Sequence, residues 1–218
     1  MTVRLTRFGV LGDVHTEDEA LAIALETLGG LELDAVLAVG DLLDGHGDPD
    51  RTCALLRDAR VVAVTGNHDR WFLTGSQLGW DTDTTELHDA HRDWLASLPS
   101  TRRFDTPLGG LLLCHGVGED DMAVLRPDTD RYSLAWLEPL HALCAAPELS
   151  LMVGGHTHER MVRAFDGLTV INAGTLHRDF HQGFLTVDLE ARVVQAHDVV
   201  DGRVVAAERY DVPDVASR

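Results

Sequence analysis

Short apolar runs that stop at glycine or polar residues recur along the first third of the chain. The runs Phe8–Leu11, Ala35–Val39 and Val61–Val64 are typical of buried strands, because aliphatic and β-branched residues fill consecutive positions. Two segments between them, Leu21–Leu28 and roughly residues 48–59, carry apolar residues at helical spacing. This alternation of strands and helices predicts a parallel sheet with right-handed crossover connections.

Local signals set the expected ends of these two helices. Thr16, followed three residues later by Glu19, is typical of a capping box, and Gly29-Gly30 is expected to end the first helix. Asp48, with Pro49 at the first helical position, is expected to start the second helix.

The pattern changes after residue 70. Trp71–Asp83 shows no period and is expected to be irregular, while Leu87–Leu98 has the spacing of an amphipathic helix that stops at Pro99. Ser133–Ala145 is helical in pattern, with a kink or split expected at Pro139. The other apolar runs predict strands, and turns such as Asp166-Gly167 suggest that several form antiparallel hairpins: Leu111–Cys114, Leu151–Val153, Val162–Phe165, Leu168–Ile171, Phe184–Val187, Arg192–Val199 and Val204–Arg209.

Polar side chains follow five of the predicted strands at their carboxyl ends. They are Asp13 and His15, Asp41, Asn67 and His68, His115, and His156 and His158. Each one alone is typical of a polar turn in which the side chain bonds to nearby backbone. Because open α/β sheets build their sites at the carboxyl ends of strands, their joint occurrence predicts that these side chains converge on one region.

The chemistry of this set points to metal ions. Imidazole, carboxylate and amide ligands without thiolate favour manganese, iron or zinc over a soft metal or a structural zinc. Seven ligand residues are too many for one catalytic ion that keeps an open coordination position. They suit two ions that share a bridging carboxylate, and such a pair, about 3.5–4 Å apart, suits in-line displacement at phosphorus.

Composition narrows the class of protein. A length of 218 residues fits one domain over residues 1–218, and a formal net charge of −18 argues against binding long nucleic acid through a basic face. The three cysteines, Cys53, Cys114 and Cys144, show no CxxC spacing. This argues against a disulfide framework, and cysteines without disulfides fit a reducing cytoplasm. No segment reaches the length needed to span a membrane, so we expect a cytoplasmic protein without a membrane partner. The oligomeric state is left open.

The motifs GDVH, GDLLD, GNHD, CHG and GGHTH, in this order from Asp13 to His158, resemble those of the calcineurin-like metallophosphoesterase family, in its small bacterial-type phosphodiesterase and phosphatase branch. The resemblance implies an α/β fold, a four-layer α-β-β-α sandwich of two mixed β-sheets flanked by helices. It also implies the ligands of each ion. Asp13, His15 and His158 would bind the first metal, and Asn67, His115 and His156 the second, with Asp41 bridging the two.

The same resemblance suggests the residues that act on the substrate. His68 would be the general acid or would orient the phosphate, with Asp69 or Asp44 steadying it, and Asn67 would also contact the substrate. Arg70 and Arg178 are candidate phosphate clamps, although each also has the character of an ordinary surface charge.

Four further polar residues stay unassigned: His46, His177, Asp179 and His181 are interpreted as surface residues that could also line the pocket.

The resemblance implies a dinuclear metal-dependent phosphoester hydrolase, with manganese as the expected metal and iron, zinc or nickel as alternatives. Its substrate would be a small phosphodiester, nucleotide or phosphomonoester. Alternatives are a protein Ser/Thr phosphatase, a dinucleoside-polyphosphate hydrolase, and a non-catalytic scaffold of the same fold. Asn172–Thr175 departs from the Asn-Pro-Gly-Ser turn of some small phosphodiesterases. The sequence does not distinguish diester from monoester substrates.

Overall fold

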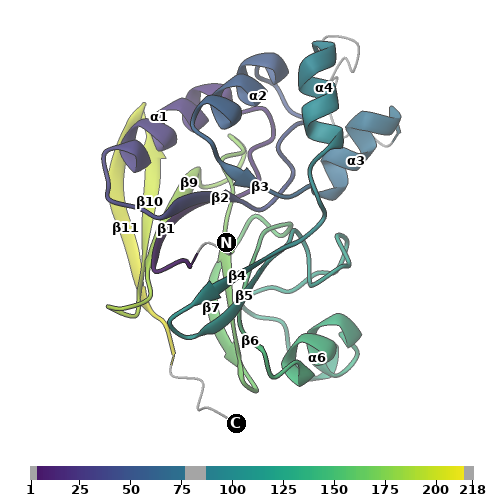
Figure 1. The fold of residues 1–218 in the computed structure, drawn as a ribbon, viewed down its shortest axis with the longest axis vertical. Coiled ribbons are helices and arrows are strands. Elements are labelled where there is room, and N and C mark those ends of the chain that lie inside the picture. The colour runs from purple at the N-terminus through teal and green to yellow at the C-terminus, as the bar shows by residue number, and fades with distance from the viewer. Residues whose placement is uncertain (1–3, 77–86, 214–218) are drawn as a thin grey trace.

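Two β-sheets packed face to face form the centre of the computed structural model, which describes residues 4–76 and 87–213 (Figure 1). The larger sheet has six strands in the order β11-β10-β9-β1-β2-β3. Its strands are β1 (Arg7–Leu11), β2 (Ala35–Ala38), β3 (Val62–Ala63), β9 (Gly183–Asp188), β10 (Val193–Val200) and β11 (Arg203–Asp211). The first three are parallel, and β9 runs antiparallel to β1, so the sheet is mixed.

The second sheet is also mixed and has five strands in the order β4-β5-β6-β8-β7. Its strands are β4 (Arg102–Thr106), β5 (Gly109–Leu113), β6 (Leu149–Gly154), β7 (Arg160–Phe165) and β8 (Leu168–Ala173). The pairs β5–β6 and β6–β8 are parallel, whereas β4–β5 and β7–β8 are antiparallel. In each sheet, neighbouring parallel strands therefore have their carboxyl ends on the same side.

Helices cover the outer faces of the two sheets (Figure 1). α1 (Asp18–Gly29) and α2 (Pro49–Asp58) lie over the six-stranded sheet, and α6 (Glu138–Ala145) lies over the five-stranded sheet. Three shorter helices complete the described elements: α3 (Asn67–Thr74), α4 (Asp89–Ala96) and α5 (Arg131–Ala135). The four-layer arrangement of two mixed sheets flanked by helices is confirmed.

Alternation along the strands separates the apolar layers. Phe8 and Val10 of β1 pack with Leu151 and Val153 of β6 in the layer between the sheets. Leu11, on the opposite face of β1, packs instead in the layer with the helices above the six-stranded sheet. Because successive strand residues point to opposite faces, both faces of a buried strand must be apolar. The uninterrupted apolar runs of the sequence follow from this burial.

The start of α2 agrees with the sequence signal, and the start of α1 does not. The Asp48 side chain accepts a hydrogen bond from the backbone N–H of Arg51 at 3.0 Å, as an N-cap should. The predicted Thr16 cap is wrong: α1 is capped at Glu17 without a side-chain bond. Thr16 has φ 55°, and an N-cap needs extended backbone.

Several expected elements differ in extent. β3 contains only two residues and lies at the edge of its sheet, although the run Val61–Val64 suggested a strand buried on both faces. β4 was not predicted, because its sequence Arg102–Thr106 is polar and four of its five residues are exposed or half-buried. The helical pattern from Ser133 is split as expected, but at residues 136–137, and Pro139 lies in the first turn of α6.

The prediction that Trp71–Asp83 is irregular is wrong for residues 71–74, which belong to α3. Residues 77–83 of this stretch lie outside the described part of the chain. Among the described residues, no helix combines the length and apolar character needed to cross a membrane.

Candidate metal centre

The polar residues predicted from the strand ends lie together at one edge of the sandwich. They follow β1, β2 and β3 of the larger sheet and β5 and β6 of the smaller one, so both sheets contribute. The loop after β8 joins them, because the N–H of Leu176 and the hydroxyl of Thr175 both donate to the backbone carbonyl of Asp13, at 2.9 and 2.7 Å. The sandwich thus brings together side chains that are up to 145 positions apart in the sequence, from Asp13 to His158.

One group of side chains surrounds Asp13. The Nε2 atom of His158 lies 3.1 Å from Nε2 of His15 and 3.3 Å from Oδ2 of Asp13. Asp13 and His15 are fully buried. The other carboxylate oxygen of Asp13 accepts a hydrogen bond from the backbone N–H of His156 at 3.2 Å, whereas no donor reaches Oδ2.

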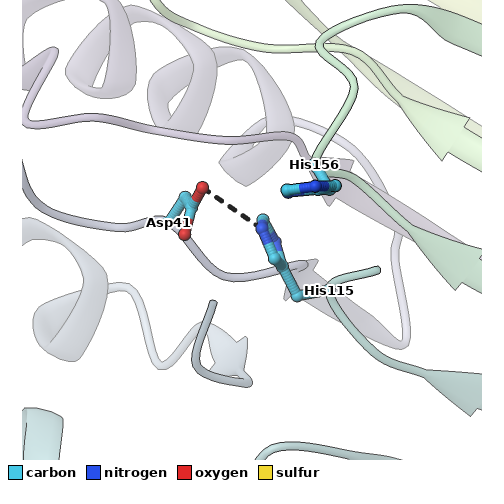
Figure 2. Close-up of side chains that lie close together, drawn as sticks. All are labelled: Asp41, His115 and His156. Carbon is cyan, nitrogen blue, oxygen red and sulfur yellow. Dashed lines mark ion pairs between the residues drawn. The ribbon is translucent and has the colours of Figure 1, made fainter. Parts of the chain in front are cut away.

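A second group surrounds His115. Its Nε2 atom lies 3.2 Å from Oδ2 of Asp41 and 3.0 Å from Oδ1 of Asn67. Figure 2 shows Asp41, His115 and His156 turned toward one common region, and ligand atoms of these three residues lie within 4.8 Å of one another. Oδ2 of Asp41 is also 3.8 Å from Nε2 of His15. Asp41 therefore faces both groups, as a bridging ligand must.

The backbone at these positions is strained. His15, Asp41, His156 and His158 have φ of 46°, 46°, 71° and 60°. Residues other than glycine adopt this left-handed conformation at a cost of about 1–3 kcal/mol each, and such strain concentrates at functional sites. Close approach adds a second constraint, because a Cβ atom at Gly66 would collide with the carboxylate of Asp41. Only glycine can connect β3 to Asn67 at this distance from Asp41.

Backbone carbonyls fix the tautomers of two of the histidines. Nδ1 of His15 lies 2.9 Å from the carbonyl of Asp44, and Nδ1 of His115 lies 3.1 Å from the carbonyl of Val39. A carbonyl only accepts, so each Nδ1 carries a proton, and each ring in its neutral form turns its Nε2 lone pair into the site. There the lone pairs face carboxylate and amide oxygens. Acceptors that face acceptors are stable with a cation between them, so the donor set fits metal ions.

The pKa values agree with this reading. Burial raises the pKa of Asp13 to about 7 and lowers the pKa values of His15 and His158 to about 4 and about 3. Asp41 is equally buried, but His115 and the other imidazoles around it hold its pKa below the usual range. The pKa of His115 is raised to about 9, since Asp41 outweighs the effect of burial. A proton on His115 thus occupies the place that a metal would take.

His68 lies beside this centre and is paired with Asp44. Its Nδ1 atom is 2.6 Å from Oδ2 of Asp44, a fully buried carboxylate, and its backbone N–H donates to Oδ1 of Asp41 at 2.8 Å. Partial burial lowers the pKa of His68, but the bond to Asp44 and the charge of Asp41 outweigh burial and raise it. Of the two carboxylates considered as partners of His68, the structure pairs it with Asp44.

Asp69 has a different set of contacts. Oδ1 of this fully buried carboxylate accepts the N–H groups of Leu42 and Leu43 at 2.8 and 3.0 Å, and Oδ2 accepts the N–H of Gly66 at 2.9 Å. These bonds join the loop after β2 to the start of α3. Asp69 therefore sets the positions of Asp41 and Asn67 through the backbone.

The two candidate phosphate clamps are both ion-paired. Arg70 forms three contacts of 2.8–3.0 Å with Asp121, and Arg178 binds Glu17 through Nε at 2.7 Å and through its second guanidinium nitrogen at 2.9 Å. Glu17 is buried, whereas about half of each arginine side chain is exposed. A phosphate would have to compete with these carboxylates.

Sequence reasoning missed the burial of His177. This residue, interpreted as a surface histidine, is fully buried, and its ring centroid lies 5.2 Å from that of His15 and 6.0 Å from that of His158. Phe180 packs edge-on against His158 at 4.5 Å. The apolar run Leu168–Ile171 before this loop was the available signal, because it makes the loop follow another buried parallel strand. His46, Asp179 and His181 are exposed, as expected.

Comparison with known structures shows the same fold. The chain is 22% identical to a metallophosphoesterase from Sphaerobacter thermophilus, with a TM-score of 0.63 over 90% of this chain and 89% of that one. It is 14% identical to the hypothetical protein PH1004 from Pyrococcus horikoshii, with a TM-score of 0.70 over 94% and 87%. Vps29 from Entamoeba histolytica, complexed with Zn²⁺, is 19% identical, with a TM-score of 0.54 over 95% and 99%.

Comparison of sequences identifies the family. The uncharacterized protein MJ0912 of Methanocaldococcus jannaschii is 28% identical over 71 residues, which is 33% of this chain and 29% of that protein, so the match spans less than a third of the relative. The family model of the calcineurin-like phosphoesterase superfamily domain matches residues 7–192 and thus includes every strand end described above. This chain belongs to the calcineurin-like phosphoesterase superfamily.

Proposed function

We propose that this protein is a metal-dependent hydrolase of a small phosphoester, a diester, nucleotide or phosphomonoester, and that it holds two divalent ions. One observation carries the proposal: Nε2 of His115 faces Oδ2 of Asp41 and Oδ1 of Asn67 at 3.2 and 3.0 Å. Nε2 of His15 lies 3.8 Å from the same oxygen of Asp41 and 3.1 Å from Nε2 of His158. Electron-rich atoms at these distances need a proton or a metal ion between them, and the imidazole, carboxylate and amide types of this set suit a divalent metal.

The two ions would divide the seven residues. Asp13, His15 and His158 would hold one ion, Asn67, His115 and His156 the other, and Asp41 would bind both. Manganese suits this set of oxygen and imidazole ligands, with iron, zinc or nickel as alternatives. The neighbouring thiol of Cys114 supplies no ligand: burial raises its pKa to about 12, and its Sγ points at the carbonyl of Gly116. When bound, such ions activate water and neutralise charge on the phosphoryl oxygens.

The chain's own residues supply the remaining chemistry. His68, held through Nδ1 by Asp44, would present its Nε2 proton to the leaving-group oxygen, and the raised pKa of His68 keeps that proton available near neutral pH. Asp44 fixes the ring and stabilises its charged form. Asp69 holds the loops that carry Asp41 and Asn67. Arg70 and Arg178 would reach a phosphate only by leaving Asp121 and Glu17.

Turnover of bis(4-nitrophenyl) phosphate and 4-nitrophenyl phosphate, by enzyme loaded with Mn²⁺, Zn²⁺ or Mg²⁺ and by chelated enzyme, tests this function. We expect activity that requires the metal and is lost in Asp41→Asn. Asp201→Asn is the matched control, because Asp201 has a similar φ of 49° but lies exposed in the turn between β10 and β11. Hydrolysis by fully chelated enzyme, or full activity of Asp41→Asn, would refute the proposal.

A further inference from the structure

A cavity of about 580 Å³ adjoins the candidate metal centre and shares one wall with it. That wall is His158, whose Nε2 atom lies 3.3 Å from Asp13. Phe180 also lines the cavity, and its ring contacts His158 edge-on at 4.5 Å between centroids. The cavity therefore lies within reach of a substituent on a phosphoryl group at the metal centre.

The polar lining of the cavity is mainly acidic. It includes the carboxylates Glu159, Asp179, Asp198 and Glu208 and the single guanidinium of Arg160. Arg160 is engaged by this lining, at 2.6 Å from Asp198 and 3.3 Å from Glu208, and it also donates to the carbonyl of His197. Glu159 is paired with Arg126. The remaining excess of negative charge comes from Asp179 and from Glu208, which shares Arg160 with Asp198.

The rest of the described lining consists of two aromatic rings together with Pro127 and His181. Phe180 is half exposed, so its ring is available to a ligand, and Tyr210 extends from β11. Burial and, after it, the charge of Glu208 raise the pKa of Tyr210, so its ring stays neutral beside the carboxylates. Aromatic faces beside carboxylates are the usual environment of an organic ammonium group.

We propose that this cavity selects phosphoesters whose alcohol carries an ammonium group, with the phosphoryl group at the metal centre and the cation among Asp179, Glu208, Phe180 and Tyr210. This inference rests on the proposed hydrolase function and adds a substrate class to it. The chain's formal charge of −18 gives the preference a physical reason. An anionic phosphoester is repelled by such a protein, whereas a zwitterionic one is not.

A pair of substrates that differ only in charge tests the selection. 4-Nitrophenyl phosphorylcholine carries a quaternary ammonium, and 4-nitrophenyl 3,3-dimethylbutyl phosphate replaces the nitrogen by carbon. Hydrolysis adds water across the P–O bond to nitrophenol in both, so released nitrophenolate reports each reaction. We expect the kcat/KM of the choline ester to exceed that of its isostere by roughly 10-fold, consistent with one exposed cation–π contact plus one exposed ion pair.

Asp179→Asn should lower this ratio about threefold, because it removes one exposed ion pair and keeps the aromatic contacts. Asp58→Asn, at the exposed end of α2, makes the same charge change away from the cavity and should leave the ratio unaltered. The ratio is measured within one protein sample, so a change in metal loading or folding cancels.

The outcomes separate this inference from the function on which it rests. Equal kcat/KM for the two diesters in an enzyme that hydrolyses bis(4-nitrophenyl) phosphate would overturn the ammonium selection alone. A ratio that is the same in Asp179→Asn and wild type would also overturn it. A metal-loaded enzyme that hydrolyses 4-nitrophenyl phosphate but none of these three diesters would overturn this inference and keep the hydrolase function. An enzyme that hydrolyses none of the four compounds would remove the hydrolase function and this inference with it.

Discussion

Removing the charge of Asp44 tests the assignment of His68 as the proton donor. Asn at this position keeps the size of the side chain, and asparagine tolerates the left-handed backbone of residue 44, whose φ is 68°. The substitution replaces the carboxylate 2.6 Å from Nδ1 of His68 by a neutral amide. The ring keeps a hydrogen-bond partner but loses the charge that raises its pKa.

The size of the effect follows from the distance. Two unit charges about 4 Å apart interact by ~2 kcal/mol at an effective dielectric constant of about 40, between the values for water and for a protein surface. The side chain of His68 is 18% exposed, so solvent screens part of the interaction. Loss of that energy lowers the pKa of His68 toward its ordinary value. Because neighbouring carboxylates raise this pKa in the wild type, the protonated acid persists to higher pH there. The alkaline limb of kcat/KM should therefore move to lower pH in Asp44→Asn.

The assay uses two leaving groups over a range of pH. Nitrophenolate leaves without protonation, whereas phenolate is a poorer leaving group and needs the acid. Above the pKa of His68, Asp44→Asn should hydrolyse a phenyl phosphodiester roughly 30-fold more slowly, with a smaller loss on bis(4-nitrophenyl) phosphate. Asp50→Asn is the control, because Asp50 makes an equivalent 2.5 Å contact with Nδ1 of His91 between α2 and α4. An unmoved alkaline limb, or the same loss on both leaving groups, would refute the assignment.

Two further substitutions test the scaffold around the metals. Asp69→Asn should lower the free energy of unfolding by about 2–3 kcal/mol, because its amide group would face the N–H of Gly66 and leave buried donors unpaired. Urea denaturation of the metal-free protein measures this loss, and unchanged stability would contradict the role of Asp69 in holding the loops. Gly66→Ala should displace the carboxylate of Asp41, so elemental analysis should find less bound metal than in the wild type. Full metal content with full activity would contradict this, because it would show that the loop accommodates a Cβ atom.

The strand ends were predictable because their signal is local. Each apolar run that stops at a glycine and a polar residue, such as Phe8–Leu11 before Gly12 and Asp13, reports its own burial and its own end. The helix start at Asp48 is local in the same way, since capping acts over three residues. Parallel pairing then brings the strand ends together without further information from the sequence.

The contacts that the sequence left open are long-range. Asp44 and Asp69 are both near the motifs, and only the folded positions show that Asp44 reaches His68 while Asp69 holds the backbone of the neighbouring loops. Arg178 meets Glu17 across 161 positions of the chain, and no local pattern marks that pairing. Thr16 failed as a helix cap because the loop beside His15 imposes a left-handed backbone that overrides the local preference.

Anomalous diffraction from crystals of manganese-loaded protein tests the central claim most directly. Two manganese peaks, about 3.5–4 Å apart and on either side of the Asp41 carboxylate, are the predicted result. Asp13, His15 and His158 should surround one peak, and Asn67, His115 and His156 the other. A single peak, or two peaks that do not share Asp41, would contradict the dinuclear account.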